Sequence, residues 1–106
     1  MPKFLTKWKV NPKMMPTSPQ ECMKLLQSMN ENIKALLDSG ILIDFGEYCD
    51  GSGGYTIGEV DDVADLYAYL IQWWPYVDFD AKPVLTIDQV IKSTDKAVAE
   101  MKGKNS

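Results

Sequence analysis

Two carboxylates near the middle of the chain are the side chains whose types and spacing best suit chemistry. Glu47 and Glu59 lie in two apolar runs on either side of a glycine-rich stretch, residues 50–54. If the runs form a hairpin and both glutamates face one side, repulsion makes one carboxylate a stronger base, as general-base catalysis requires. Tyr55 is a third, weak candidate for a catalytic group. The alternative is that each glutamate is an ordinary strand residue, solvated or paired with lysine.

Aromatic side chains suggest a second kind of site, a pocket for a small ligand. Trp8, Tyr55 and Trp73 are expected between the sheet and its helices, and Tyr48 at a strand end completes this candidate set. Tryptophan and tyrosine combine a large apolar surface with one polar tip that can orient a ligand. Packing of a hydrophobic core explains the same residues without any ligand, and both interpretations stay open.

The composition excludes several classes of site. There is no histidine, and all eleven cationic residues are lysine. A Ser-His-Asp triad, a histidine-ligated haem and most zinc sites therefore cannot form within one chain. Cys22 and Cys49 are too few for a disulfide framework. We accordingly expect no metal and no cofactor.

The net charge and the hydropathy limit which partners and which cellular compartment are expected for the chain. A net charge of −4 argues against nucleic acid, because nucleic-acid-binding proteins usually carry a basic stripe. No apolar run approaches the ~20 residues of a membrane span, and the N-terminus lacks the apolar core of a signal peptide. We expect a cytoplasmic protein with one domain at residues 1–102 and a disordered tail at 103–106.

Hydrophobic periodicity and N-capping signals predict the secondary structure. The expected elements are a strand at 3–10, a helix at 19–39, a hairpin at 41–60, a helix at 63–74, a strand at 76–85 and a helix at 87–102. Capping boxes at 18–21 and 86–89 mark two of the helix starts, and Asp61 or Asp62 caps the helix between them. That middle helix is expected to bury one stripe of residues, which consists of Val63, Leu66, Tyr67, Leu70, Ile71 and Trp74.

The order of these elements, β-α-β-β-α-β-α, predicts a ferredoxin-like α+β fold with an extra C-terminal helix. Its antiparallel sheet has the strand order 4-1-3-2, and both crossing helices lie on one face. Lys7 and Lys9 on the first strand then lie beside Asp78 and Asp80 on the last. The other face is bare although residues 41–43 are all apolar, so a second copy of the sheet is the simplest cover. The C-terminal helix is the competing cover.

Three segments resemble a known superfamily: KFLTKWKVNP at 3–12, GGYTIGEVDD at 53–62 and QWWPYVDFDAKPVL at 72–85. They are similar to the dimeric α+β-barrel superfamily, in which two ferredoxin-like sheets face each other, and more narrowly to short bacterial and archaeal proteins known as a domain of unknown function. The superfamily includes muconolactone isomerase-like enzymes, cofactor-free antibiotic-biosynthesis monooxygenases, YCII-like proteins and haem-binding dismutases. Its histidine-dependent branches do not fit this chain, and no catalytic residue is carried over by motif.

The resemblance and the bare sheet face together imply a homodimer joined through that face. The first hypothesis is therefore a small-molecule-binding homodimer of the dimeric α+β-barrel type, without a cofactor. The second is a cofactor-independent monooxygenase or isomerase that acts on a small aromatic or lactone-like compound. The third is a non-catalytic structural or interaction module.

Overall fold

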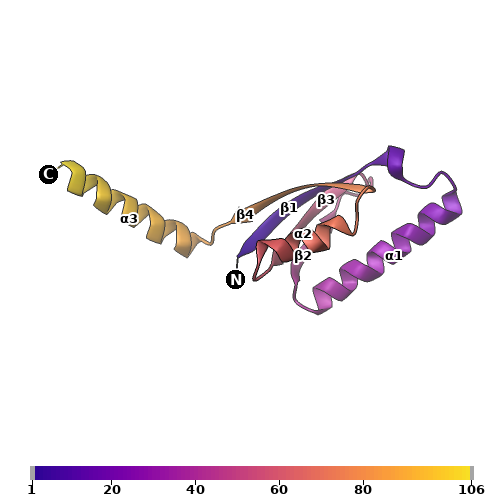
Figure 1. Cartoon of the computed structure of the whole chain (residues 1–106), viewed down its shortest axis with the longest axis horizontal. Coiled ribbons are helices and arrows are strands. Elements are labelled where there is room, and N and C mark those ends of the chain that lie inside the picture. The colour runs from indigo at the N-terminus through magenta and orange to yellow at the C-terminus, as the bar shows by residue number, and fades with distance from the viewer. Residues whose placement is uncertain (1, 106) are drawn as a thin grey trace.

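The computed structural model describes residues 2–105 as an α+β fold, with a four-stranded antiparallel sheet and three α-helices (Figure 1). In chain order the elements are β1 (Lys3–Val10), the short 3-10 helix η1 (Pro12–Met14), α1 (Pro19–Asp38), β2 (Leu42–Glu47), β3 (Gly53–Glu59), α2 (Val63–Ile71), β4 (Val77–Val84) and α3 (Ile87–Asn105). None of the described helices is both long and apolar enough to cross a membrane.

Local sequence signals account for the starts of the helices. At α1 the Ser18 hydroxyl accepts a hydrogen bond from the Glu21 backbone N–H at 3.4 Å, and Asp62 caps α2 in the same manner. At α3 the capping box forms in both directions, because the Gln89 N–H donates to Thr86 Oγ1 and the Thr86 N–H donates to Gln89 Oε1. Each cap satisfies backbone groups that have no partner inside the helix, so these predicted starts are confirmed.

The strands are arranged in the order β2-β3-β1-β4, and every neighbouring pair is antiparallel. This is the predicted 4-1-3-2 order, and the arrangement is compatible with a ferredoxin-like fold. Successive residues of a strand point to opposite faces of a sheet. Trp8 of β1 pairs with Gly54 of β3 and Phe79 of β4, and these three positions share one face. Lys7 pairs with Tyr55 and Asp80, and these three share the other face.

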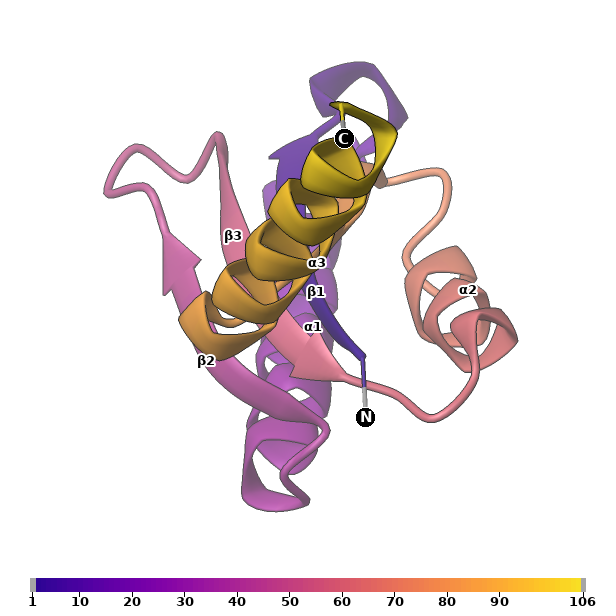
Figure 2. The same cartoon turned by 90° about the vertical axis from the view of Figure 1, so that its left-hand side faces the viewer.

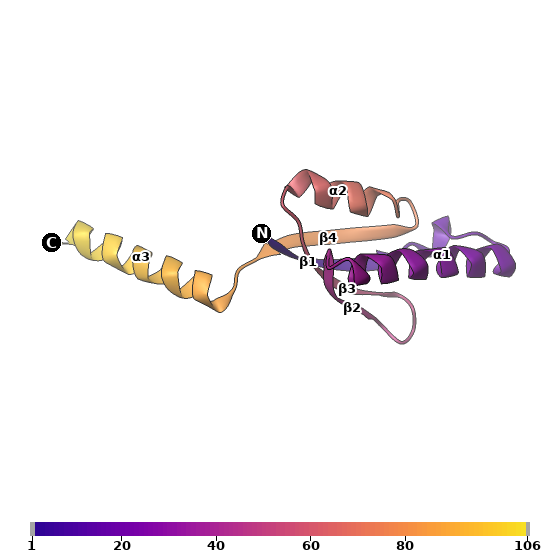
Figure 3. The same cartoon turned by 90° about the horizontal axis from the view of Figure 1, so that it is seen from below.

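Helices α1 and α2 lie on the same side of the sheet, as Figures 2 and 3 show from two directions. We call this side the helix-covered face and the other side the open face. Phe4, Thr6 and Trp8 of β1 belong to the helix-covered face, where they meet residues of both helices around one cavity. Leu5 and Lys7, between them in the sequence, belong to the open face. The sheet therefore has one face with a helical cover and one without.

Helix α3 continues outward from the end of β4 and does not return to the sheet (Figures 1 and 3). The molecule is consequently elongated, with principal extents of 69 × 28 × 26 Å. Its radius of gyration is 18.6 Å, whereas a compact chain of this length has about 13 Å. Residues 87–103 are all exposed. The helix thus does not cover the open face of its own chain, which was the competing expectation.

Two expectations about the helices need correction, and the first concerns the tail. The sequence predicts disorder at 103–106, but α3 continues to Asn105, and Ser106 lies outside the described residues. A glycine in a final helical turn weakens the helix without blocking its hydrogen bonds, so Gly103 does not end it.

The second correction concerns α2, which ends at Ile71 and buries a different side from the predicted stripe. Leu66 and Leu70 face the sheet together with Tyr69 and Trp73. The other predicted residues are exposed, namely Val63, Tyr67, Ile71 and Trp74. The helix is apolar over more than one side, so periodicity alone could not say which side faces the sheet.

Candidate functional site

A cavity of about 190 Å³ lies between the helix-covered face and helices α1 and α2. Its floor includes Phe4 and Trp8 from β1, Phe45 from β2 and Phe79 from β4. Its roof includes Met29 and Ile33 from α1 with Leu66 and Leu70 from α2. Most of the lining is therefore aromatic or aliphatic, as in typical sites for small organic ligands.

The cavity occupies the place where a packed core is expected. Among the described residues, Phe4, Val60 and Val77 are the buried hydrophobic ones, and Thr6 is the buried polar one. Protein interiors are normally close-packed, with few voids larger than a water molecule. The gap between this sheet and its helices is thus a departure from ordinary packing.

Trp8 is the central aromatic residue of the cavity floor. Its ring stacks on Phe45 with centroids 5.7 Å apart and planes inclined by 17°. The absence of a side chain at Gly54 makes room for it, because a Cβ there would lie 2.7 Å from Trp8 Cζ2 and would collide with the Gly46 carbonyl oxygen. Among the side chains that the structure describes, those of residues 2–103, Trp8 Nε1 is the one buried nitrogen or oxygen without a hydrogen-bond partner. A buried donor without an acceptor is unfavourable, so the indole N–H of Trp8 lowers the stability of the folded chain.

A few polar groups interrupt the apolar lining. They are Thr6 and Thr56 on adjacent strands, Asn30 on α1, Tyr69 on α2 and Glu47 at the end of β2. Glu47 is the one acidic residue among the residues that line this cavity. Glu47 is exposed, and its carboxylate is the group in the lining that could accept a proton from a bound molecule.

The structure brings together three of the residues predicted for a site. Trp8, Trp73 and Glu47 all line the cavity. Tyr48 does not; its side chain is 58% exposed and lines a separate open depression at the hairpin end of the sheet, together with Lys7 and Asp80.

Tyr55 lies on the open face and not between sheet and helices as the sequence suggested. It pairs with Lys7, and its hydroxyl donates a hydrogen bond to Asp44 Oδ2 at 2.9 Å. This bond to a carboxylate raises the pKa of the Tyr55 phenol above its usual value of 10.0, and desolvation adds to the effect. The physical reason for the correction is the strand alternation: Gly54 and Thr56 take the helix-covered positions and leave Tyr55 on the other side.

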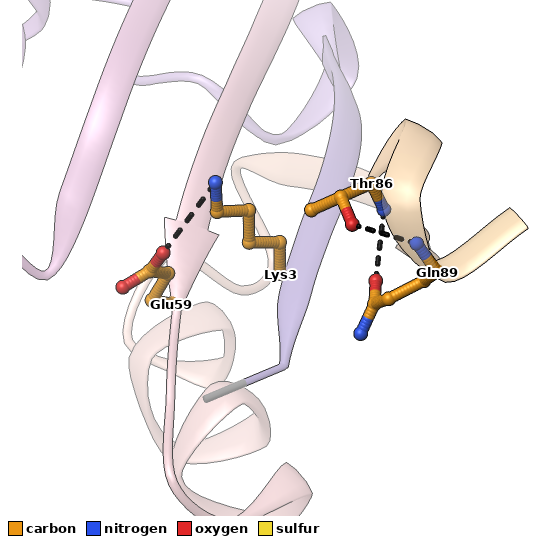
Figure 4. A network of polar contacts seen from close by, with 4 residues as sticks. All are labelled: Lys3, Glu59, Thr86 and Gln89. Atoms are coloured by element: carbon orange, nitrogen blue, oxygen red, sulfur yellow. Dashed lines mark hydrogen bonds and ion pairs between the residues drawn. The ribbon is translucent and has the colours of Figure 1, made fainter. Parts of the chain in front are cut away.

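Glu59 also lies on the open face, where its Oε1 is 3.7 Å from Lys3 Nζ (Figure 4). Glu47 pairs with Gly54 and Glu59 pairs with Lys3, so the two carboxylates are about 16 Å apart along the hairpin and on opposite faces. The structure does not bring them together as a pair of interacting carboxylates. The ordinary alternative, a glutamate paired with lysine, describes Glu59.

The charged residues of β1 and β4 lie in the predicted register. Lys7 is opposite Asp80, and Lys9 is opposite Asp78. The ion pair that forms here joins Asp80 Oδ2 to Lys82 Nζ at 3.7 Å, within β4. All of these groups belong to the open face and take no part in the cavity.

The glycine-rich turn of the hairpin is held by local hydrogen bonds. Asp50 Oδ1 accepts from the Ser52 backbone N–H at 2.9 Å and from the Ser52 hydroxyl at 2.7 Å. The backbone bond, followed by the hydroxyl bond, lowers the pKa of Asp50 below its usual value. The Asp50 carboxylate therefore has a structural role, which is to hold the turn.

Sequence reasoning missed Phe45, Asn30 and Tyr69. Phe45 could have been found from its place two residues before Glu47, since alternate strand residues share a face. Asn30 and Tyr69 carried no such signal, because each is a single polar group on a helix whose facing side depends on tertiary packing. Within the described part of the chain, no three acidic or thiol side chains gather in a way that could hold a metal ion.

Comparison with protein families gives a match over most of the chain. The family model described as a domain of unknown function, DUF3303, matches residues 2–98, which include the sheet, α1, α2 and the first part of α3. No curated protein matches the chain.

Proposed function

The chain belongs to the DUF3303 family, described as a domain of unknown function, and we propose that it binds a small, largely apolar molecule in the cavity between the sheet and helices α1 and α2. The proposed functional unit is a homodimer that meets through the open face of the sheet. The cavity itself is the observation that carries this proposal.

The size of the cavity sets the size of the ligand. An apolar cavity of about 150 Å³ accommodates benzene, so a volume of about 190 Å³ suits a compound with one or two small rings. A ligand that fills the cavity gains contacts with the apolar lining and removes its surface from water, which favours occupancy.

The polar groups on the wall define what else the ligand needs. Thr6, Asn30 and Tyr69 can exchange hydrogen bonds with a carbonyl or hydroxyl group, and Glu47 accepts a hydrogen bond when ionised. All other aspects of the lining favour an uncharged aromatic or alicyclic body. We therefore propose a neutral ring compound with one or two oxygen or nitrogen substituents.

A reaction on such a compound is the second candidate function, because a carboxylate lies on the cavity wall. In a cofactor-independent isomerase or monooxygenase, Glu47 would remove a proton from the bound substrate as a general base. Glu59 and Tyr55 cannot assist from the open face. A purely structural module would be favoured by a closely packed interface between sheet and helices, which this chain does not have.

The open face supports the homodimer. Leu5, Tyr55 and Ile57 lie there half-buried, next to charged residues, and no described helix covers them. A two-fold contact between identical faces would cover both copies with one interface.

Thermal melting with small aromatic probes tests the ligand proposal, because a compound that binds only the folded state raises the melting temperature. Indole and 2-naphthol are suitable probes at millimolar concentration. Leu70→Trp fills the cavity from its roof, and Ile71→Trp adds a similar bulk at the next residue, which is 47% exposed. We expect a rise in melting temperature for the native chain and for Ile71→Trp, and none for Leu70→Trp. No rise with the native chain, or an equal rise in all three proteins, would contradict binding in this cavity.

A further inference from the structure

Helices α2 and α3 each carry an apolar stripe that is exposed in the described chain. The α2 stripe consists of Val63, Tyr67 and Ile71 on the helix and Trp74 in the turn that follows it, and these residues are 47–71% exposed. It lies about a quarter turn away from the cavity-lining residues of the same helix. The α3 stripe consists of Ile87, Ile91, Thr94, Val98 and Met101. Its four hydrophobic members are 44–70% exposed.

The spacing of the α3 stripe indicates what it packs against. Its members follow one another at steps of four, three, four and three residues, which is the seam by which one helix packs on another. A lone helix of this length is marginal in water, because most helical stability comes from packing of an apolar side. The reciprocal capping box at Thr86 and Gln89 fixes the start of α3 (Figure 4) but covers none of its apolar surface. The helix therefore requires a partner helix.

The exposed area points to a second copy of the chain as the source of that helix. The chain exposes 8001 Å², whereas a compact monomer of 11.9 kDa exposes about 5,900 Å². Each copy thus exposes roughly 2,000 Å² more than a compact monomer would, while a standard stable interface buries about 1,600 Å² in total from both partners. Two copies have more than enough surface to cover each other.

We infer that α3 is an exchanged arm: the α3 helix of each copy packs antiparallel on the α2 stripe of the other copy. The inference rests on the proposed homodimer and deepens it, because it names a contact beyond the open face. The α3 stripe is long enough to cover the α2 stripe: the part on α2, Val63 to Ile71, spans about 12 Å, and the α3 stripe spans about 21 Å.

The charges at the helix ends favour this direction of packing. The start of α2 is acidic, with Asp61, Asp62 and Asp65, whereas α3 begins near Asp88 and ends near Lys102. Antiparallel packing on a second copy places Lys102 beside the acidic start of α2. If α3 folded back on its own chain, it would run antiparallel to β4, as α2 does, and therefore parallel to α2. Asp88, at the start of α3, would then lie beside the same acidic group. Like charges repel there, so the exchanged arrangement is the better one.

The test uses full-length variants and their mass in solution. Ile91→Asp puts a charge into the α3 stripe, and Tyr67→Asp puts one into the α2 stripe. Ser93→Asp is the matched control, because residue 93 lies on the opposite side of α3 from residue 91. We expect the native chain and Ser93→Asp to be dimers with similar dissociation constants. Ile91→Asp and Tyr67→Asp are each expected to dissociate at least tenfold more readily.

Mixing the two defective variants identifies the contact. In a heterodimer, the intact arm of the Tyr67→Asp copy meets the intact α2 stripe of the Ile91→Asp copy, so one exchanged contact is restored. We expect the equimolar mixture to contain more dimer than either variant alone. Circular dichroism confirms that each variant is folded; if Ile91→Asp is not, Val98→Asp with Ala99→Asp as its control replaces it.

The possible outcomes separate this inference from the proposed homodimer. A native chain that stays monomeric overturns both. If Ile91→Asp or Tyr67→Asp dimerises as the native chain does, or if the mixture shows no recovery, the exchanged arm is overturned while the homodimer through the open face stands.

Discussion

The two faces of one four-stranded sheet differ in chemistry although they are built from the same strands. On the helix-covered face, Trp8 stacks on Phe45 and lines a cavity below two helices. On the open face, Lys7 and Glu59 lie among half-buried apolar residues without a helical cover. Since neighbours in a strand point to opposite sides, residues adjacent in sequence serve different purposes. On this difference rests the proposal that a ligand binds at one face and a second copy at the other.

The largest expected effect comes from comparing two adjacent residues of β1. Trp8→Ala removes the ring that stacks on Phe45, and truncation of such a large aromatic residue costs about 3 kcal/mol. Lys7→Ala, on the open face, should change the free energy of unfolding by less than about 0.5 kcal/mol. Urea denaturation at matched protein concentration measures both values. Equal losses would mean that the two faces do not differ in packing.

A second comparison uses two glycines that lie close to an aromatic ring. A methyl group at Gly54 would meet backbone of β2 as well as Trp8, so Gly54→Ala should cost about 2–3 kcal/mol. At Gly46 the nearest atoms to an added methyl all belong to the Tyr55 ring. That ring can turn away and lose its hydrogen bond to Asp44, so Gly46→Ala should cost about 1 kcal/mol. The reverse ranking in urea melts would show that the open face is the more tightly packed one.

The smallest expected effect is a pH dependence of the open face. Because the hydrogen bond to Asp44 raises the pKa of Tyr55, folding favours the protonated phenol. Its contribution to stability is complete below the ordinary pKa of 10.0 and is lost as pH rises through the raised value. Tyrosinate absorbance should show a transition for Tyr55 above the ordinary tyrosine pKa of 10.0.

Two variants control this titration. Asp44→Asn should move the late transition to lower pH, and Tyr48→Phe, which removes an exposed hydroxyl, should leave it unchanged. A late transition that survives Asp44→Asn would contradict the assignment to Tyr55.

Local signals in the sequence predicted most of the fold. Alternation in β1, the capping residues Ser18 and Thr86, and the order of the elements led to the observed sheet order and to the position of β4 at an edge. These features depend on residues close together in the chain. The side of α2 that faces the sheet was predicted incorrectly, because several of its sides are apolar and only tertiary packing decides between them.

The candidate site was less predictable. Trp8, Trp73 and Glu47 were named from the sequence and line the cavity, whereas Tyr55 and Glu59 lie on the open face. The strand alternation that separates Glu47 from Glu59 depends on the register of the hairpin, and the length of its glycine-rich turn left that register open. The aromatic residues predicted a pocket between the sheet and the helices but left a packed core as the alternative, because the distance between the sheet and the helices decides between the two.

The mass of the native chain in solution most directly tests the claim that a second copy covers the open face of the sheet. Light scattering over a dilution series at micromolar concentration reports whether two copies associate, as coverage of the open face and α3 requires. The account predicts a mass near twice the 11.9 kDa of one chain, which falls only on strong dilution. A mass near 11.9 kDa at every concentration would contradict it.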